Sequence, residues 1–303
     1  MSGKWTFAVA LALGAALCYA GANVSQAISV RRQPHRDRID LSLVVRMLRQ
    51  PLWLAGLGAS VVGFALEATA LGLAPVVLVQ PLVVAELLFA LPLAALATGS
   101  RLGRRERIGA LLVGLGLAAF ALVVNPTNPK FTAGSGTWVV LLGVVAAAVG
   151  VMLLIAFRKR GIVRTSATAV AAAVVFGLLA VLTKTCARDF AAHGVAALAT
   201  WQPWAVAGTG IIGETLAQNA FAAGPLAISL PLIDIGEPLV ASIISIVVFG
   251  ERISGLTQSS LAAILIAAAA TTAGVIALDT SPLVQAAQRD FANNSTETSP
   301  ITD

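Results

Sequence analysis

Apolar runs of about 20 residues recur along the whole chain, and each is long enough to cross the hydrocarbon core of a bilayer as a helix. Hydrophobic residues make up 58% of the 303 residues and charged residues 11%. A soluble protein carries more than twice that share of charge. The runs lack the alternation of a barrel strand, and only helices and closed barrels satisfy their backbone groups in lipid. We therefore predict an all-α polytopic membrane protein.

The apolar runs predict nine transmembrane helices. Two of the joins between them are tight, at Gly72–Pro75 and Gly224-Pro225, because glycine and proline end one helix and start the next. The predicted helices cover residues 5–29, 51–72, 75–97, 108–124, 137–157, 166–186, 202–223, 225–249 and 257–278.

The chain contains an internal repeat in its second, third, seventh and eighth helices. Pro75 is followed after five residues by Pro81-Leu82, and Pro225 is followed after five residues by Pro231-Leu232. With the fifth helix as a linker, helices 1–4 and 6–9 would enter the membrane from opposite sides, which is the inverted repeat of many secondary transporters. We predict one transmembrane domain over 1–278, with repeat one at 5–124, the linker at 137–157 and repeat two at 166–278, and a disordered cytoplasmic tail at 279–303.

The basic residues predict the orientation of the chain. Fourteen Lys and Arg residues lie in three loops, at 31–49, 101–107 and 158–164, which all fall on one side of the nine-helix arrangement. By the positive-inside rule, the amino terminus is outside and the carboxyl terminus is cytoplasmic. The net charge of +6 is thus a topology signal and does not indicate nucleic-acid binding. The use of Ala and of Arg over Lys favours a bacterial source, and therefore the inner membrane.

Five acidic side chains interrupt the apolar runs: Glu67, Glu86, Glu214, Asp234 and Glu237. An ionised carboxylate in hydrocarbon is costly, so such groups face a protein interior or a water-filled path. Counted at 1.5 Å per residue, Glu86 lies about 16 Å into its helix and Glu237 about 18 Å, close to the bilayer midplane. The alternative for each acid is a buried, protonated group with a structural role.

Other polar residues accompany these acids. Asp234 and Glu237 share a helix face between Pro231 and Pro238, and prolines free backbone carbonyls that suit a hydrated cation or a proton. Lys184 lies near the outer end of its helix, where it either snorkels to the interface or neutralises a cavity carboxylate. The predicted substrate or ion pathway comprises Glu67, Gln80, Glu86, Lys184, Glu214, Gln218, Asn219, Asp234 and Glu237.

Several of these segments together resemble a known family. The chain has Val79-Gln80-Pro81-Leu82 in one half, Gly213-Glu214 followed by Pro225 in the other, and Gly250-Glu251-Arg252 at the end of the second copy. In order and spacing these are similar to the NIPA-type magnesium transporters of the drug/metabolite transporter (DMT) superfamily, over residues 7–278. The paired segments Val24-Ser-Gln26 and Leu182-Thr-Lys184 look similar as well. The chain departs from that pattern at Ser100-Arg101, where the family has an acid, and at Phe64, where the family often has a polar residue. It also departs at Glu67 and Glu86, because the family has neutral residues at these positions.

The resemblance implies a secondary transporter of a divalent cation such as magnesium, and the superfamily implies a small polar or amphipathic solute. Alternating access, with coupling to protons, is the mechanism we expect from acids at the midplane. The alternatives are a flippase for lipids or lipid-linked sugars, and a membrane scaffold that transports nothing. No nucleophile–base constellation, ATP-binding motif or cofactor motif is present, so we expect neither an enzyme nor a primary pump. The expected partners are the lipid bilayer and the substrate, with a homodimer left open.

Overall fold

The computed structural model describes residues 3–31, 50–98, 102–124, 134–223, 226–251 and 257–280, and every regular element in these ranges is a helix. Within these ranges eight spans are long and apolar enough to cross a membrane, one fewer than the nine predicted from the sequence. This confirms the predicted all-helical fold and indicates a polytopic membrane protein. In chain order the elements are α1 (Gly3–Arg31), α3 (Pro51–Leu73), α4 (Val76–Val83), α5 (Glu86–Thr98), α6 (Arg104–Val123), α7 (Ser135–Arg158), α8 (Ile162–His193), the 3-10 helix η1 (Gly194–Ala199), α9 (Gln202–Ala223), α10 (Leu226–Phe249) and α11 (Gln258–Asp279).

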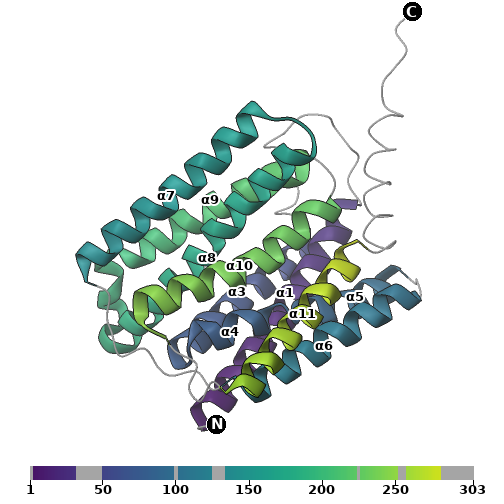
Figure 1. The fold of residues 1–303 in the computed structure, drawn as a ribbon, viewed down its shortest axis with the longest axis horizontal. Helices are drawn as coiled ribbons and strands as arrows, with labels where there is room; N and C mark the ends of the chain where they lie inside the picture. The colour runs from purple at the N-terminus through teal and green to yellow at the C-terminus, as the bar shows by residue number, and fades with distance from the viewer. Residues whose placement is uncertain are drawn as a thin grey trace, which may run out of the picture.

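The helices form two neighbouring groups that meet at α3, α4 and α10 (Figure 1). In one group α8 packs against α7, α9 and α10, and in the other α1 packs against α3 and α5 while α6 packs against α11. The pair α1 and α3 opens the first predicted repeat, and the pair α8 and α9 opens the second. Contact between the groups includes α4 against α10 and α3 against α8.

The predicted span at 75–97 is confirmed as a candidate membrane crossing, but it is not one continuous helix, because the chain forms two helices there, α4 and α5. At the break, Ala85 N donates to Leu82 O at 3.0 Å, a tighter turn than an α-helix allows. Pro81 inside α4 lacks an N–H, and the β-branched residues that follow it are weak helix formers, so the segment loses helical support. The break makes Glu86 the first residue of α5.

The predicted end of the sixth helix, at residue 186, is also wrong. The helix α8 continues to His193 and ends at Gly194, which has a φ of 57°. The polar residues near its end can remain helical because a helix can extend beyond the hydrocarbon. The other predicted helices agree with the structure to within a few residues. The predicted tail beyond residue 280, Arg101, and the join Gly224-Pro225 lie outside the described residues.

Glycines let α6 and α11 approach closely. A Cβ built on Gly116 would lie 2.8 Å from Ala267 O and 2.9 Å from Thr271 N, both of which belong to the backbone of α11. Small residues at such crossings permit close packing of helices in lipid, where no hydrophobic force drives the helices together.

We expect Gly116→Leu to destabilise the protein by about 1–3 kcal/mol, because its side chain would overlap backbone atoms that cannot move away. The measurement is the unfolding temperature of the detergent-solubilised protein. Gly143→Leu on α7 is the matched control, since a Cβ there meets nothing within 4 Å. Equal unfolding temperatures for the two variants would contradict close packing of α6 on α11.

Candidate functional site

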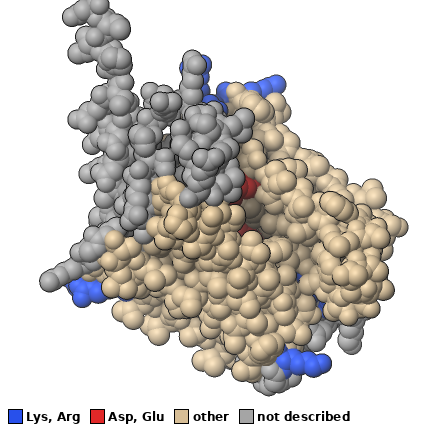
Figure 2. All heavy atoms as spheres, turned by 180° about the vertical axis from the view of Figure 1, so that it is seen from behind, with Lys and Arg blue, Asp and Glu red and all other residues tan. Residues whose placement is uncertain are grey.

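A cavity of about 330 Å³ lies among α1, α3, α4, α5, α8, α9 and α10. Figure 2 shows acidic residues at the bottom of a hollow, and the other described residues around it are mostly uncharged. All five acids predicted from the sequence, together with Gln80, line this cavity. They come from five different helices in both predicted repeats, so the fold brings together residues that are up to 170 positions apart. The acidic lining residues are Glu67, Glu86, Glu214, Asp234 and Glu237.

Glu67 on α3 is held by two donors, one for each carboxylate oxygen. Tyr19 Oη donates to Glu67 Oε2 at 2.7 Å, and Gln80 Nε2 donates to Glu67 Oε1 at 2.7 Å. A Cβ built on Gly63 would lie 3.0 Å from the ring of Tyr19, so this glycine leaves room for the tyrosine between α1 and α3. Glu67 is therefore fixed in position in the cavity wall.

Tyr19 was not among the residues predicted from the sequence. It is the single tyrosine of the chain and stands in an apolar helix. A buried phenol hydroxyl requires a hydrogen-bond partner, so its position in a membrane span was the signal available in the sequence.

Asp234 and Glu237 on α10 have a different environment from Glu67. Both line the cavity, and neither has a hydrogen-bond or ion-pair partner among the residues that the structure describes. Pro238, which also lines the cavity, has no N–H for the carbonyl oxygen of Asp234, four residues earlier in the helix. Two carboxylates and a carbonyl oxygen without a helical donor are thus available on one stretch of α10.

Glu86 and Glu214 complete the acidic lining. Glu86 begins α5 at the helix break, where the positive end of the helix dipole favours a carboxylate. Glu214 reaches the cavity from α9. Within the described residues, the lining includes no Lys or Arg, and no three acidic, His or Cys side chains lie close enough together to hold a bare metal ion. The cavity is therefore strongly acidic without forming a closed metal cage.

Two residues of the predicted pathway, Asn219 and Lys184, are not part of the cavity lining that the structure describes. Asn219 is exposed, and its Nδ2 donates to Thr215 O at 2.7 Å within α9. Gln218 lies on the same helix, and its side chain falls outside what the structure describes. Lys184 on α8 is buried elsewhere in the protein.

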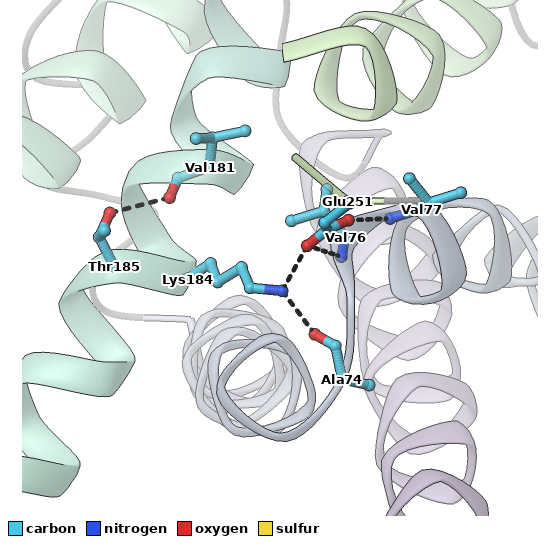
Figure 3. A network of polar contacts seen from close by, with 7 residues as sticks. All are labelled: Ala74, Val76, Val77, Val181, Lys184, Thr185 and Glu251. Carbon is cyan, nitrogen blue, oxygen red and sulfur yellow. Dashed lines mark hydrogen bonds and ion pairs between the residues drawn. The ribbon is translucent and has the colours of Figure 1, made fainter. Parts of the chain in front are cut away.

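Lys184 forms an ion pair with Glu251, just beyond the end of α10 (Figure 3). Its Nζ lies 2.7 Å from Glu251 Oε1 and donates to Ala74 O at 2.9 Å. Val76 N and Val77 N, at the start of α4, donate to the two oxygens of Glu251 at 3.2 and 3.3 Å. Lys184 is 1% exposed and Glu251 is 0% exposed. The predictions that Lys184 snorkels to the interface or neutralises a cavity carboxylate are therefore wrong.

This network fixes the end of the bundle where α3 ends and α4 begins. Glu251 satisfies two N–H groups that the first turn of α4 leaves without helical partners. Gly250 has a φ of 63°, a conformation that glycine adopts without strain, and it turns the chain so that Glu251 reaches α4. The network ties α3, α4 and α8 to the end of α10.

We expect Lys184→Met to destabilise the protein by about 3–5 kcal/mol, because it leaves the carboxylate of Glu251 buried without its cation. Lys184→Met combined with Glu251→Gln should be less destabilising than Lys184→Met alone, since the buried charge is removed with its partner. Chemical denaturation in detergent measures the stability of Lys184→Met, of Glu251→Gln and of the double variant. The ion pair would have no such role if the double variant were as unstable as the sum of the two single variants.

No protein-family model and no solved structure matches the chain. A relative named "Uncharacterized protein Cgl0250/cg0304", from Corynebacterium glutamicum, is 30% identical over 246 residues, which cover 81% of this chain and 85% of the relative. The name of this relative states no activity.

Proposed function

The chain belongs to the family of this Corynebacterium glutamicum protein, and from its cavity we propose that it is a secondary transporter of the DMT type that carries a small cation, with magnesium as the leading candidate. The observation that carries the proposal is the gathering of five acidic side chains around one cavity whose described lining contains no Lys or Arg. Carboxylates in a membrane interior are costly and mark substrate or ion pathways.

The size and ligands of the cavity favour a cation that keeps part of its water shell. Magnesium dehydrates reluctantly and usually binds through one or two carboxylates and several waters. A volume of about 330 Å³ is enough for an ion and its first shell, because one water takes about 30 Å³ in the liquid. Asp234 and Glu237, which have no described protein partner, are the direct or water-mediated ligands in this proposal. Glu67, held by Tyr19 and Gln80, is a fixed charge in the wall.

Alternating access is supported by the arrangement of the proline segments. Pro81 lies in α4 and Pro231 in α10, these helices pack against each other, and one comes from each predicted repeat. Helices weakened by proline can change shape where neighbours or a cavity satisfy their backbone. In the proposed cycle, the two repeats rock about the acidic cavity and open it to one side at a time. The proposed setting is the bacterial inner membrane, with the amino terminus outside and the carboxyl terminus cytoplasmic.

We expect Asp234→Asn and Glu237→Gln each to reduce cation uptake about tenfold to a hundredfold, because each removes a charged ligand. The measurement is magnesium uptake into proteoliposomes loaded with a fluorescent indicator. Asn219→Ala is the matched control, since Asn219 is exposed and does not line the cavity. Uptake that is equal in all four proteins would contradict the proposed site. Transfer of labelled lipid between leaflets without cation uptake would favour a flippase.

Proton coupling is a separate part of the proposal. In the described lining of the cavity, the titratable groups are the five acids and Tyr19. If protons and the cation compete for Asp234 and Glu237, uptake should rise as the external pH rises. An imposed pH gradient, acidic inside, should then drive uptake against a cation gradient. Flux that does not change with pH, in protein that transports the cation, would refute the coupling and leave the cation site intact.

A further inference from the structure

A second cavity, of about 680 Å³, lies between the ends of α3 and α8. Its lining includes Leu73, the last residue of α3, and Ala192, one residue before the end of α8. By the predicted orientation this end of the bundle faces the outside. The walls are mainly apolar, and Arg188 is the charged residue among the described lining.

The two cavities share two lining residues, Phe64 on α3 and Thr183 on α8. At 1.5 Å per residue, Phe64 lies about 14 Å from the end of α3, and Thr183 about 15 Å from the end of α8. The shared residues are thus at a similar depth on two adjacent helices. They form a boundary between an outer, mostly apolar cavity and the acidic cavity at the centre.

The hydroxyl group of Thr183 is buried and lacks the hydrogen bond that threonines in helices usually make. Its side chain is 3% exposed, and its Oγ1 has no hydrogen-bond partner in the described part of the protein. Threonines in helices ordinarily donate to the carbonyl four residues earlier. Two residues further along α8, Thr185 Oγ1 does so, to Val181 O at 2.9 Å. A buried hydroxyl without a partner is costly unless a water or a ligand supplies the bond.

We propose that the second cavity is the entry chamber of the transport path and that Phe64 and Thr183 form the constriction between this chamber and the acidic cavity. This inference rests on the proposed function. Thr183 Oγ1 offers an oxygen that replaces one water of the passing cation. The ring of Phe64 provides the apolar side of the constriction, and apolar constrictions close a path by excluding water.

The ion pair between Lys184 and Glu251 lies next to the constriction and holds α8 in position there. Lys184 follows Thr183 on α8 and is tied to Ala74 and Glu251. The helix that carries Thr183 is therefore held in position beside the constriction. Arg188 in the entry chamber repels a cation before it reaches the constriction, so we expect Arg188→Gln to increase the rate of cation entry.

Cysteine labelling tests the constriction directly. Cys186 lines the entry chamber and Cys18 does not line either cavity, so Cys18→Ser leaves one reporter in the chamber. The variant Cys18→Ser/Cys186→Ser/Thr183→Cys places a reporter at the constriction. A membrane-impermeant cationic methanethiosulfonate is added to intact cells or to inside-out vesicles, and labelling rates are measured by mass spectrometry.

We expect both reporters to react from the same side of the membrane, with Thr183→Cys the slower. Adding Phe64→Ala should increase the rate at Thr183→Cys about tenfold and leave the rate at Cys186 nearly unchanged. The inference is wrong if Phe64→Ala accelerates both reporters equally or neither, or if the two react from opposite sides.

A transport measurement separates this inference from the proposed function. Thr183→Val removes the hydroxyl at constant shape and should raise the KM for the cation about two- to tenfold, while Thr183→Ser should keep it near the original value. Equal KM values for the two variants would contradict contact between the hydroxyl and the cation. If no cation is transported but the labelling pattern holds, the proposed function fails and the constriction stands as the path of another solute.

Discussion

The cost of placing a carboxylate in a low-dielectric interior organises this protein. Each acid within the membrane region must be wetted, hydrogen-bonded or paired with a cation. The acids of this protein are accommodated in three ways. Asp234 and Glu237 face a cavity, Glu67 accepts hydrogen bonds from Tyr19 and Gln80, and the acid after α10 is paired with a lysine on α8. The same physical requirement therefore produces both the acidic cavity and the closed network at one end of the bundle.

Glycine and proline make these arrangements possible. Gly63 leaves room for the tyrosine that reaches Glu67, and Gly250 turns the chain so that Glu251 caps α4. Pro81 precedes the break that sets Glu86 at the start of α5, whereas α10 remains one helix despite Pro231 and Pro238. The break after Pro81 and the proline Pro238 lie beside the cavity, where carbonyl groups released by proline can meet water or an ion instead of lipid.

The sequence was sufficient to predict the helical class, most helix boundaries and the acids of the cavity, because apolar run length and the cost of charge are local properties. It was not sufficient for features that depend on distant partners. Lys184 and Glu251 are 67 positions apart, and nothing near Lys184 in the chain indicates its counter-ion. Tyr19 and Glu67 are 48 positions apart. The inverted repeat remains a prediction from the two proline segments, as do the orientation and the likeness to magnesium transporters.

The central claim is that the cavity acids bind a cation, and the most direct measurement is the thermal stabilisation of purified protein by divalent cations. We predict that magnesium raises the unfolding temperature in a saturable manner, as expected for a ligand that binds the folded state, and that Asp234→Asn/Glu237→Gln abolishes this rise. An unfolding temperature that no divalent cation changes, or one that rises equally in the double variant, would contradict the account.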